Sequence, residues 1–300
     1  MDRSITRAAF WMAGWLAALL TITVAGRELA SELPVFMIML FRSVIALAFL
    51  IPIVLWLDGE PLRTRRLGGH LVRNFVHYSA QFCWFYALSL IPLARVVAIE
   101  FTMPIWTAIL AALFLAERLS PSRIAAIVLG FIGILMIVRP GIEQIGTGEF
   151  SAFYAALAFA VAMILTKSLT HTESALTVIV YMFIIQALIG LLPALSVWTW
   201  PSPAAWPWVI VLGVAGGLSH YCLARAFAAA EATVVVPMDF LRVPLTALLG
   251  WLLYAEKIDI WLALGAGLIL SGNLLNLRQE GGKAPAAAVR SLPARKPAEE

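Results

Sequence analysis

Long apolar runs, separated by short polar segments, fill the chain from residue 8 to residue 278. Most runs are close to the roughly 20 residues that a helix needs to cross a hydrocarbon core of about 30 Å. Proline, glycine and charged residues mark their ends. The pattern predicts ten membrane-spanning helices, over residues 8–27, 34–57, 70–90, 93–116, 122–139, 149–168, 174–197, 206–228, 231–254 and 258–277.

The predicted third helix, 70–90, carries a polar and aromatic face. His77, Gln81 and Trp84 follow one another at i, i+4 and i+7, so they share one stripe, and Tyr78 lies on the adjoining one. Facing lipid, such groups would lack hydrogen-bond partners. The face therefore points to a neighbouring helix or to a cavity, and the pattern is equally compatible with either.

Composition supports a membrane protein. Hydrophobic residues make up 62% of the chain and charged residues 13%, whereas a soluble domain is about half apolar and one quarter charged. The net charge of +4 does not require a nucleic-acid partner, because Arg63, Arg65 and Arg66 lie between two predicted spans, where topology calls for cations. Two cysteines, inside predicted spans, are too few for a disulfide framework or a four-ligand zinc site. We expect no metal and no cofactor.

Charge asymmetry predicts the orientation. The first apolar run lacks a small-residue cleavage site, so it is interpreted as the first helix and not as a signal peptide. Residues 279–300, rich in Ala, Pro, Lys and Arg, are predicted to form a disordered cytoplasmic tail. With ten spans, one side of the membrane collects most of the cations, and the other side has only Arg27, Arg95, Arg139 and Lys257. The positive-inside rule then places both termini in the cytoplasm.

The chain repeats itself at an offset of 139 residues. Residues 83–139 align without a gap on residues 222–278, which places Glu100 on Asp239 and Phe101 on Phe240. Each repeat holds five predicted helices, an odd number, so the second must enter the membrane from the opposite side. Secondary transporters use this plan and bind substrate at the midplane between the repeats.

The predicted fold is therefore an all-α membrane protein of ten transmembrane helices. It consists of two inverted five-helix repeats, residues 8–140 and 149–278, around a central cavity. A small-molecule substrate and the lipid bilayer are the expected partners. The oligomeric state is expected to be a monomer or a homodimer.

Three segments carry a resemblance to a known family: FRSVIALAFL, which contains Arg42, residues 104–141 (PIWTAILAALFLAERLSPSRIAAIVLGFIGILMIVRPG) and residues 243–275 (VPLTALLGWLLYAEKIDIWLALGAGLILSGNLL). They resemble the two EamA domains of the drug/metabolite transporter superfamily. Within that superfamily, the ten spans and the aromatic third helix are most similar to bacterial exporters of aromatic amino acids. The resemblance implies a secondary transporter of the bacterial inner membrane that exports aromatic and neutral amino acids. Export or uptake of another small metabolite or drug-like solute is the alternative.

Charged and aromatic groups inside the predicted spans are the candidate functional residues, because an ionisable group in a bilayer needs a partner or a role. Asp239 and Arg242, at i,i+3 spacing, can neutralise each other. With Glu100 they are interpreted as structural ion pairs or as proton-coupling groups. The candidate substrate-binding residues are His77, Tyr78, Gln81, Trp84, Glu100, Phe101, Tyr221 and Arg42.

Other classes of function find little support. The sequence has no phosphate-binding loop of the Gly-x4-Gly-Lys-Ser/Thr type, which a primary pump would need. It also has no Gly-x-Ser-x-Gly motif and no intramembrane His/Glu cluster, so an intramembrane enzyme is disfavoured. A channel would require a continuous pore and would conduct ions without saturable exchange.

Overall fold

The computed structural model describes residues 3–57, 59–114, 121–139, 145–170, 172–229, 235, 238–257 and 259–281. All regular elements in these ranges are helical, which confirms the all-α class. They are α1 Arg3–Ala30, α2 Val35–Trp56, a 3-10 turn Glu60–Leu62, α3 Leu67–Leu90, α4 Leu93–Glu100, α5 Met103–Phe114, α6 Pro121–Val138, α7 Thr147–Thr170, α8 Ala175–Ser196, α9 Trp206–Ala229, α11 Arg242–Tyr254 and α12 Ile260–Gly281. Helix α12 extends three residues into the predicted tail, whose remainder lies outside the described ranges.

Five of these helices, α1, α2, α7, α8 and α9, are long and apolar enough to span a bilayer by length and composition. Helix α3 is equally long, but its polar face lowers its hydropathy. Large apolar side chains cover the outside of the bundle, such as Trp56 at 82% exposed and Leu192 at 77%. Lipid, and not water, is the solvent that such a surface fits.

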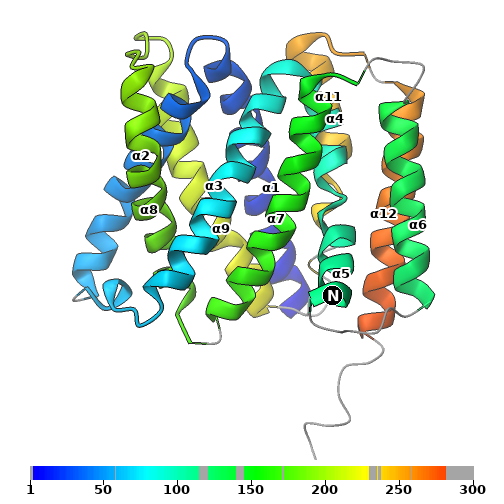
Figure 1. Cartoon of the computed structure of the whole chain (residues 1–300), viewed down its shortest axis with the longest axis horizontal. Helices are drawn as coiled ribbons and strands as arrows, with labels where there is room; N and C mark the ends of the chain where they lie inside the picture. Colours follow the sequence, from blue (N-terminus) through cyan, green and yellow to red (C-terminus); the bar gives the residue numbers. More distant parts are fainter. Residues whose placement is uncertain are drawn as a thin grey trace, which may run out of the picture.

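The helices run between two opposite faces of the bundle (Figure 1). Helix α1 begins and helix α12 ends at one face, the lower edge in Figure 1, which we call the terminal face; the opposite one is the far face. The ends of α1 and α3 meet at the far face, where Arg27 donates to the backbone oxygen of Ile91. Helix α7 starts there as well, since Gly148 packs against Ile91. Helices α1 and α7 therefore run in opposite directions.

Helix bounds repeat at the 139-residue offset. Helices α3 and α9 begin and end 139 residues apart, α2 and α8 are within one residue of that offset, and α5 and α11 start at it, as do α6 and α12. The packing follows the same symmetry: α1 packs on α9 as α7 packs on α3, while α2 packs on α8 and α6 on α12. Together with the opposite directions of α1 and α7, this arrangement is that of inverted repeats.

The prediction of one continuous fourth helix over 93–116 is wrong. Phe101 and Thr102 form a turn between α4 and α5. Pro104 has no N–H to donate to the carbonyl of Glu100, which interrupts the helical hydrogen bonds. The carbonyl of Phe101 accepts instead from Nδ2 of Asn273 on α12, at 3.0 Å. A matching turn, at Phe240–Leu241, precedes α11 at the same offset of 139 residues.

Candidate functional site

One arginine is shared by two carboxylates at the turns that precede α5 and α11. Arg242, the first residue of α11, holds Glu100 Oε1 at 3.0 Å from its Nη2 and Asp239 Oδ1 at 3.7 Å from its Nε. The residue equivalent to Arg242 in the first repeat is Met103, so that repeat offers no matching cation. We call Glu100, Asp239 and Arg242 the acidic cluster, because with all three ionised it carries one net negative charge.

Two indoles complete the hydrogen bonding of these carboxylates. Trp84 on α3 donates to Glu100 Oε2 at 2.8 Å, and Trp15 on α1 donates to Asp239 Oδ1 at 2.9 Å. The guanidinium of Arg242 also lies over the Phe101 ring, 4.7 Å from its centroid. Buried ion pairs persist when their remaining acceptors are satisfied. The cluster thus joins α1, α3, α4 and α11 across the two repeats.

A second polar group lies between α2, α3 and α8. Arg42 Nη2 donates to Gln186 Oε1 at 3.1 Å, and Gln186 Nε2 lies 2.9 Å from His77 Nδ1. One turn along α3, Arg73 Nε donates to Thr166 Oγ1 at 3.0 Å. Both arginines are buried. We call Arg42, Arg73 and His77 the basic cluster.

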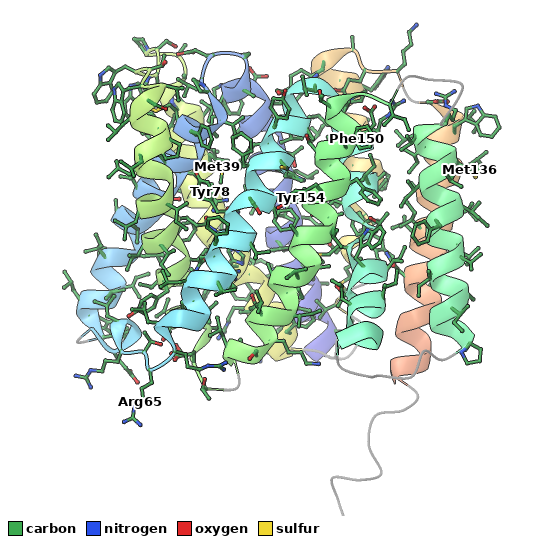
Figure 2. The ribbon with its side chains drawn as sticks, in the orientation of Figure 1. Met39, Arg65, Tyr78, Met136, Phe150 and Tyr154 are labelled. Carbon is green, nitrogen blue, oxygen red and sulfur yellow. The ribbon has the colours of Figure 1, made fainter. Side chains whose placement is uncertain are left out.

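Unpartnered polar atoms lie on the face of α3 next to the basic cluster. Tyr78 Oη and Gln81 Oε1 are buried and have no hydrogen-bond partner. Tyr78 lies about midway between the two faces of the bundle (Figure 2), against Gly190 of α8, where a Cβ would stand 2.8 Å from its hydroxyl oxygen. Buried polar atoms without partners are uncommon, so these two are the candidates on this face for a contact with a ligand.

The stripe predicted on α3 connects the two clusters. His77 belongs to the basic cluster and Trp84 donates to Glu100 of the acidic cluster, with Gln81 between them. Seven residues of helix separate the two clusters by about 10 Å. Of the other candidates, Tyr221 is half exposed and packs its ring against Trp11 of α1, apart from both clusters.

Two members of the site were not among the predicted binding residues. Gln186 bridges Arg42 and His77, and its signal was a lone amide in the otherwise apolar run MFIIQALIGLL. Trp15 holds Asp239, and its signal was its depth inside the first predicted span, 8–27, which sets it apart from the interfacial tryptophans. Among the described residues, no group of three or more His, Cys, Asp or Glu side chains is placed to hold a metal ion.

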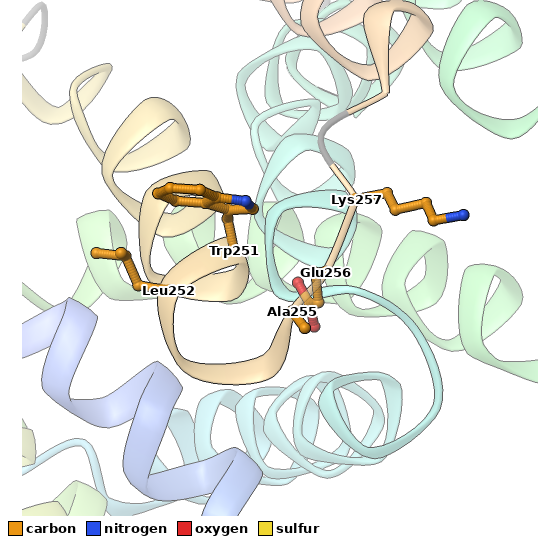
Figure 3. A pocket seen from close by; sticks show the side chains of 5 residues that line it. All are labelled: Trp251, Leu252, Ala255, Glu256 and Lys257. Atoms are coloured by element: carbon orange, nitrogen blue, oxygen red, sulfur yellow. The ribbon is translucent and has the colours of Figure 1, made fainter.

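A separate polar network lies at the far face, around Glu256. Ala255 has a left-handed backbone, φ 51°, which turns the chain at the end of α11. The carboxylate of Glu256 then accepts from the backbone N–H of Leu93 at 3.0 Å and lies 3.7 Å from Arg27. Figure 3 shows Glu256 at the wall of an open pocket, with Lys257 extending away from it. The contact ties α1, α4 and the end of α11 together.

We expect replacement of Glu256 by glutamine to change how stability depends on pH. Partial burial raises the pKa of Glu256, while the N–H of Leu93 and the Arg27 guanidinium oppose that rise. The folded protein then binds this proton more tightly than the unfolded chain. By linkage, this group's contribution to stability is largest at pH below the unfolded-state pKa, and it is lost as pH rises through the raised folded-state pKa.

Melting temperatures of the wild type and Glu256→Gln, measured from pH 4 to pH 8 in detergent, test this expectation. The wild type should lose stability relative to the variant as pH rises. A constant difference across the range would show that Glu256 titrates as it does in the unfolded chain. Lys257→Gln, which changes a neighbouring charge that extends away from Glu256, is the matched control.

The fold and its two buried clusters define a membrane protein built from inverted helical repeats around ionisable groups. The EamA-like transporter family matches the chain twice, at residues 6–139 and 146–278. The chain belongs to this family and is a small-molecule membrane transporter. A solved crystal structure with 19% sequence identity covers 93% of this chain and 99% of its own, with a TM-score of 0.64, and supports the fold.

Similar proteins include riboflavin transporters and S-adenosylmethionine uptake transporters. The riboflavin transporter of Brucella anthropi is 31% identical over 256 residues, covering 83% of this chain and 90% of that protein. The riboflavin transporter of Vibrio cholerae is 30% identical and covers 87% and 90%. The S-adenosylmethionine uptake transporter of Rickettsia bellii is 26% identical and covers 86% and 88%. These names do not support amino-acid export, and they favour the alternative expectation of uptake of another small metabolite.

Proposed function

We propose that this chain takes up a heterocyclic metabolite of the size of riboflavin across the bacterial inner membrane. Ten spans, arranged as the repeats 8–140 and 149–278, alternate access to a central cavity bordered by the inward face of α3. The terminal face is cytoplasmic, in keeping with the cations expected on that side. The substrate enters from the far face.

The observation that carries this proposal is the pair of matching turns that precede α5 and α11. The turns at Phe101–Thr102 and Phe240–Leu241 lie at equivalent positions of inverted repeats, and both carboxylates of the acidic cluster flank them. Secondary transporters build their substrate sites from such discontinuous helices at the repeat interface. The buried, unpartnered atoms of Tyr78 and Gln81 favour a site beside them.

Riboflavin is the first candidate substrate. Two riboflavin transporters are at least 30% identical to this chain over most of its length. The α3 face also offers what an isoalloxazine ring requires: aromatic surface from Trp84 and from Phe159, which packs against His77, beside hydrogen-bonding groups. Ligand sites of this kind combine an apolar lining with a few convergent polar groups.

S-adenosylmethionine is the second candidate. Two S-adenosylmethionine uptake transporters are 26% and 28% identical to the chain. The specific observation in its favour is the presence of both a basic and an acidic cluster along α3, because this metabolite carries a carboxylate and cationic groups. With its carboxylate at the basic cluster, the hydrogen-donating adenine amino group at the other end of the molecule can extend toward the acidic cluster, about 10 Å along α3.

Growth of a bacterial riboflavin auxotroph that lacks its own uptake system tests the proposal. Expression of the wild-type chain should lower the riboflavin concentration needed for half-maximal growth by tenfold or more. Expression of Tyr78→Phe with Gln81→Leu, which removes both unpartnered atoms and keeps their bulk, should give a smaller gain. An equal requirement with and without the chain, despite protein in the membrane, would exclude riboflavin uptake.

A further inference from the structure

Two arginines are buried inside the bundle with no acidic partner. Arg42 and Arg73 are each 5% exposed, and among the described residues no carboxylate pairs with either. Arg242 and Arg95, in contrast, each have a carboxylate, Glu100 and Glu149 respectively. The acceptors that the basic cluster does have, such as Gln186 and Thr166, are neutral.

The positive groups lie within electrostatic reach of one another. Arg73 lies one helical turn before His77 on α3. Gln186 holds Arg42 and His77 together by two hydrogen bonds. Arg42 Nε is buried and makes no hydrogen bond. A donor and two positive charges therefore converge on one region between α2, α3 and α8.

Such an arrangement is costly unless an anion completes it. Placing an arginine inside the hydrocarbon region of a bilayer is energetically unfavourable, and two arginines close together also repel each other. Neutral hydrogen-bond acceptors satisfy donors but leave the charge uncompensated. A purely structural role would be served better by an arginine paired with an acid, as in the acidic cluster.

We propose that the basic cluster binds an oxyanion, a carboxylate or a phosphate, carried by the transported molecule. Arginine suits this role because its planar guanidinium presents donors that match the oxygens of either group. The proposal rests on the uptake function proposed above and narrows its substrate: it favours S-adenosylmethionine, a zwitterion, or a phosphorylated flavin over riboflavin itself, which is neutral. The acidic cluster, about 10 Å further along α3, then receives a cationic or hydrogen-donating end of the same molecule.

Two pairs of probes, which differ by the oxyanion alone, test this inference. The first pair is riboflavin and riboflavin 5′-phosphate, and the second is S-adenosylmethionine and its decarboxylated form. Binding to the purified full-length chain in detergent is measured by calorimetry, and uptake is measured in proteoliposomes. For the recognised heterocycle, the member that carries the oxyanion should bind at least tenfold more tightly.

Variants of the basic cluster assign the preference to residues. Arg42→Gln and Arg73→Gln should each reduce the preference for the oxyanion to threefold or less, because affinity falls more for the member that carries the oxyanion than for the neutral or decarboxylated member. Arg42→Lys should retain part of it, because it keeps the charge. Arg65→Gln is the control, since Arg65 is exposed and projects from the lower edge in Figure 2. Melting temperatures identify variants that fail to fold. If Arg42→Gln or Arg73→Gln fails to fold, the oxyanion preferences of the wild type and of Arg42→Lys test the inference in its place.

Equal binding of both members of each pair by the wild type would overturn the inference, as would a loss of affinity in Arg42→Gln that is the same for both members. Transport of riboflavin with rejection of its phosphate would also overturn it, yet would leave the proposed uptake function standing. If neither pair is bound or transported, both the inference and the proposed function fail.

Discussion

Replacing Arg242 by methionine should destabilise the protein by about 3 kcal/mol, which lowers its melting temperature by roughly 5–10 °C. The change leaves Glu100 and Asp239 without the cation that they share. Methionine resembles the arginine stem in length, so the effect reflects lost charge more than lost volume. Removal of one partner from a buried ion pair is costly because the remaining charge is left uncompensated. Thermal unfolding in detergent measures the loss.

A triple variant is the matched control for this prediction. Arg242→Met combined with Glu100→Gln and Asp239→Asn removes all three charges, while each amide oxygen can still accept from its tryptophan. Most of the lost stability should return, since replacing a whole buried ion network by neutral groups is tolerated. If the triple variant is as unstable as Arg242→Met alone, the arginine acts through packing, for example against Phe101, and not through charge.

Replacing Gly133 by alanine should destabilise the contact between α6 and α12 by about 1–3 kcal/mol. A Cβ at Gly133 would stand 2.6 Å from the backbone oxygen of Gly265, and a Cβ at Gly265 would stand equally close to the oxygen of Gly133. Because the obstacle is backbone, no change of side-chain rotamer relieves it. The two helices must move apart and lose the close packing that small residues permit.

Gly267→Ala, on α12 of the same helix pair, is the matched control and should not reduce stability. No atom lies within 4 Å of a Cβ built there, so the alanine gains helix propensity, up to about 1 kcal/mol, without a clash. The melting temperature should fall for Gly133→Ala and stay equal or rise for Gly267→Ala. Equal behaviour of the two variants would contradict the close backbone approach of α6 and α12.

Much of the fold could be predicted from sequence because the bilayer imposes a simple rule on helix length and polarity. The gapless offset of 139 residues also predicted the second half from the first, and the paired bounds of α3 and α9 follow it. The inversion followed from the odd number of helices in each repeat. Hydrophobic patterning carries such information because it depends on which segments lie in lipid and in which direction each helix crosses the membrane, more than on individual side-chain contacts.

The interruption of the fourth helix could not be predicted from patterning. Apolar residues continue through Phe101 and Thr102, so only the missing N–H of Pro104 indicated a change, and many prolines merely bend a helix. The bond from Asn273 to the carbonyl of Phe101 joins residues far apart in the chain. Tertiary contacts of this kind have no local sequence signal.

The candidate site was predicted in its parts but not in its connections. Repeat symmetry placed Glu100 opposite Asp239, yet the sharing of Arg242 between them breaks that symmetry. Similarly, the position of Gln186 between Arg42 and His77 depends on how α2, α3 and α8 pack. The direction of transport and the substrate had no residue-level signal, and the expectation of amino-acid export came from resemblance to other members of the superfamily.

Uptake of labelled riboflavin and S-adenosylmethionine into proteoliposomes is the most direct test of the proposed carrier. The purified chain should give saturable entry of at least one of them, and this entry should be accelerated by the same unlabelled compound inside the vesicles. Protein-free vesicles should show neither effect. Entry that rises linearly with concentration, or no entry of either compound, would contradict an alternating-access carrier for these metabolites.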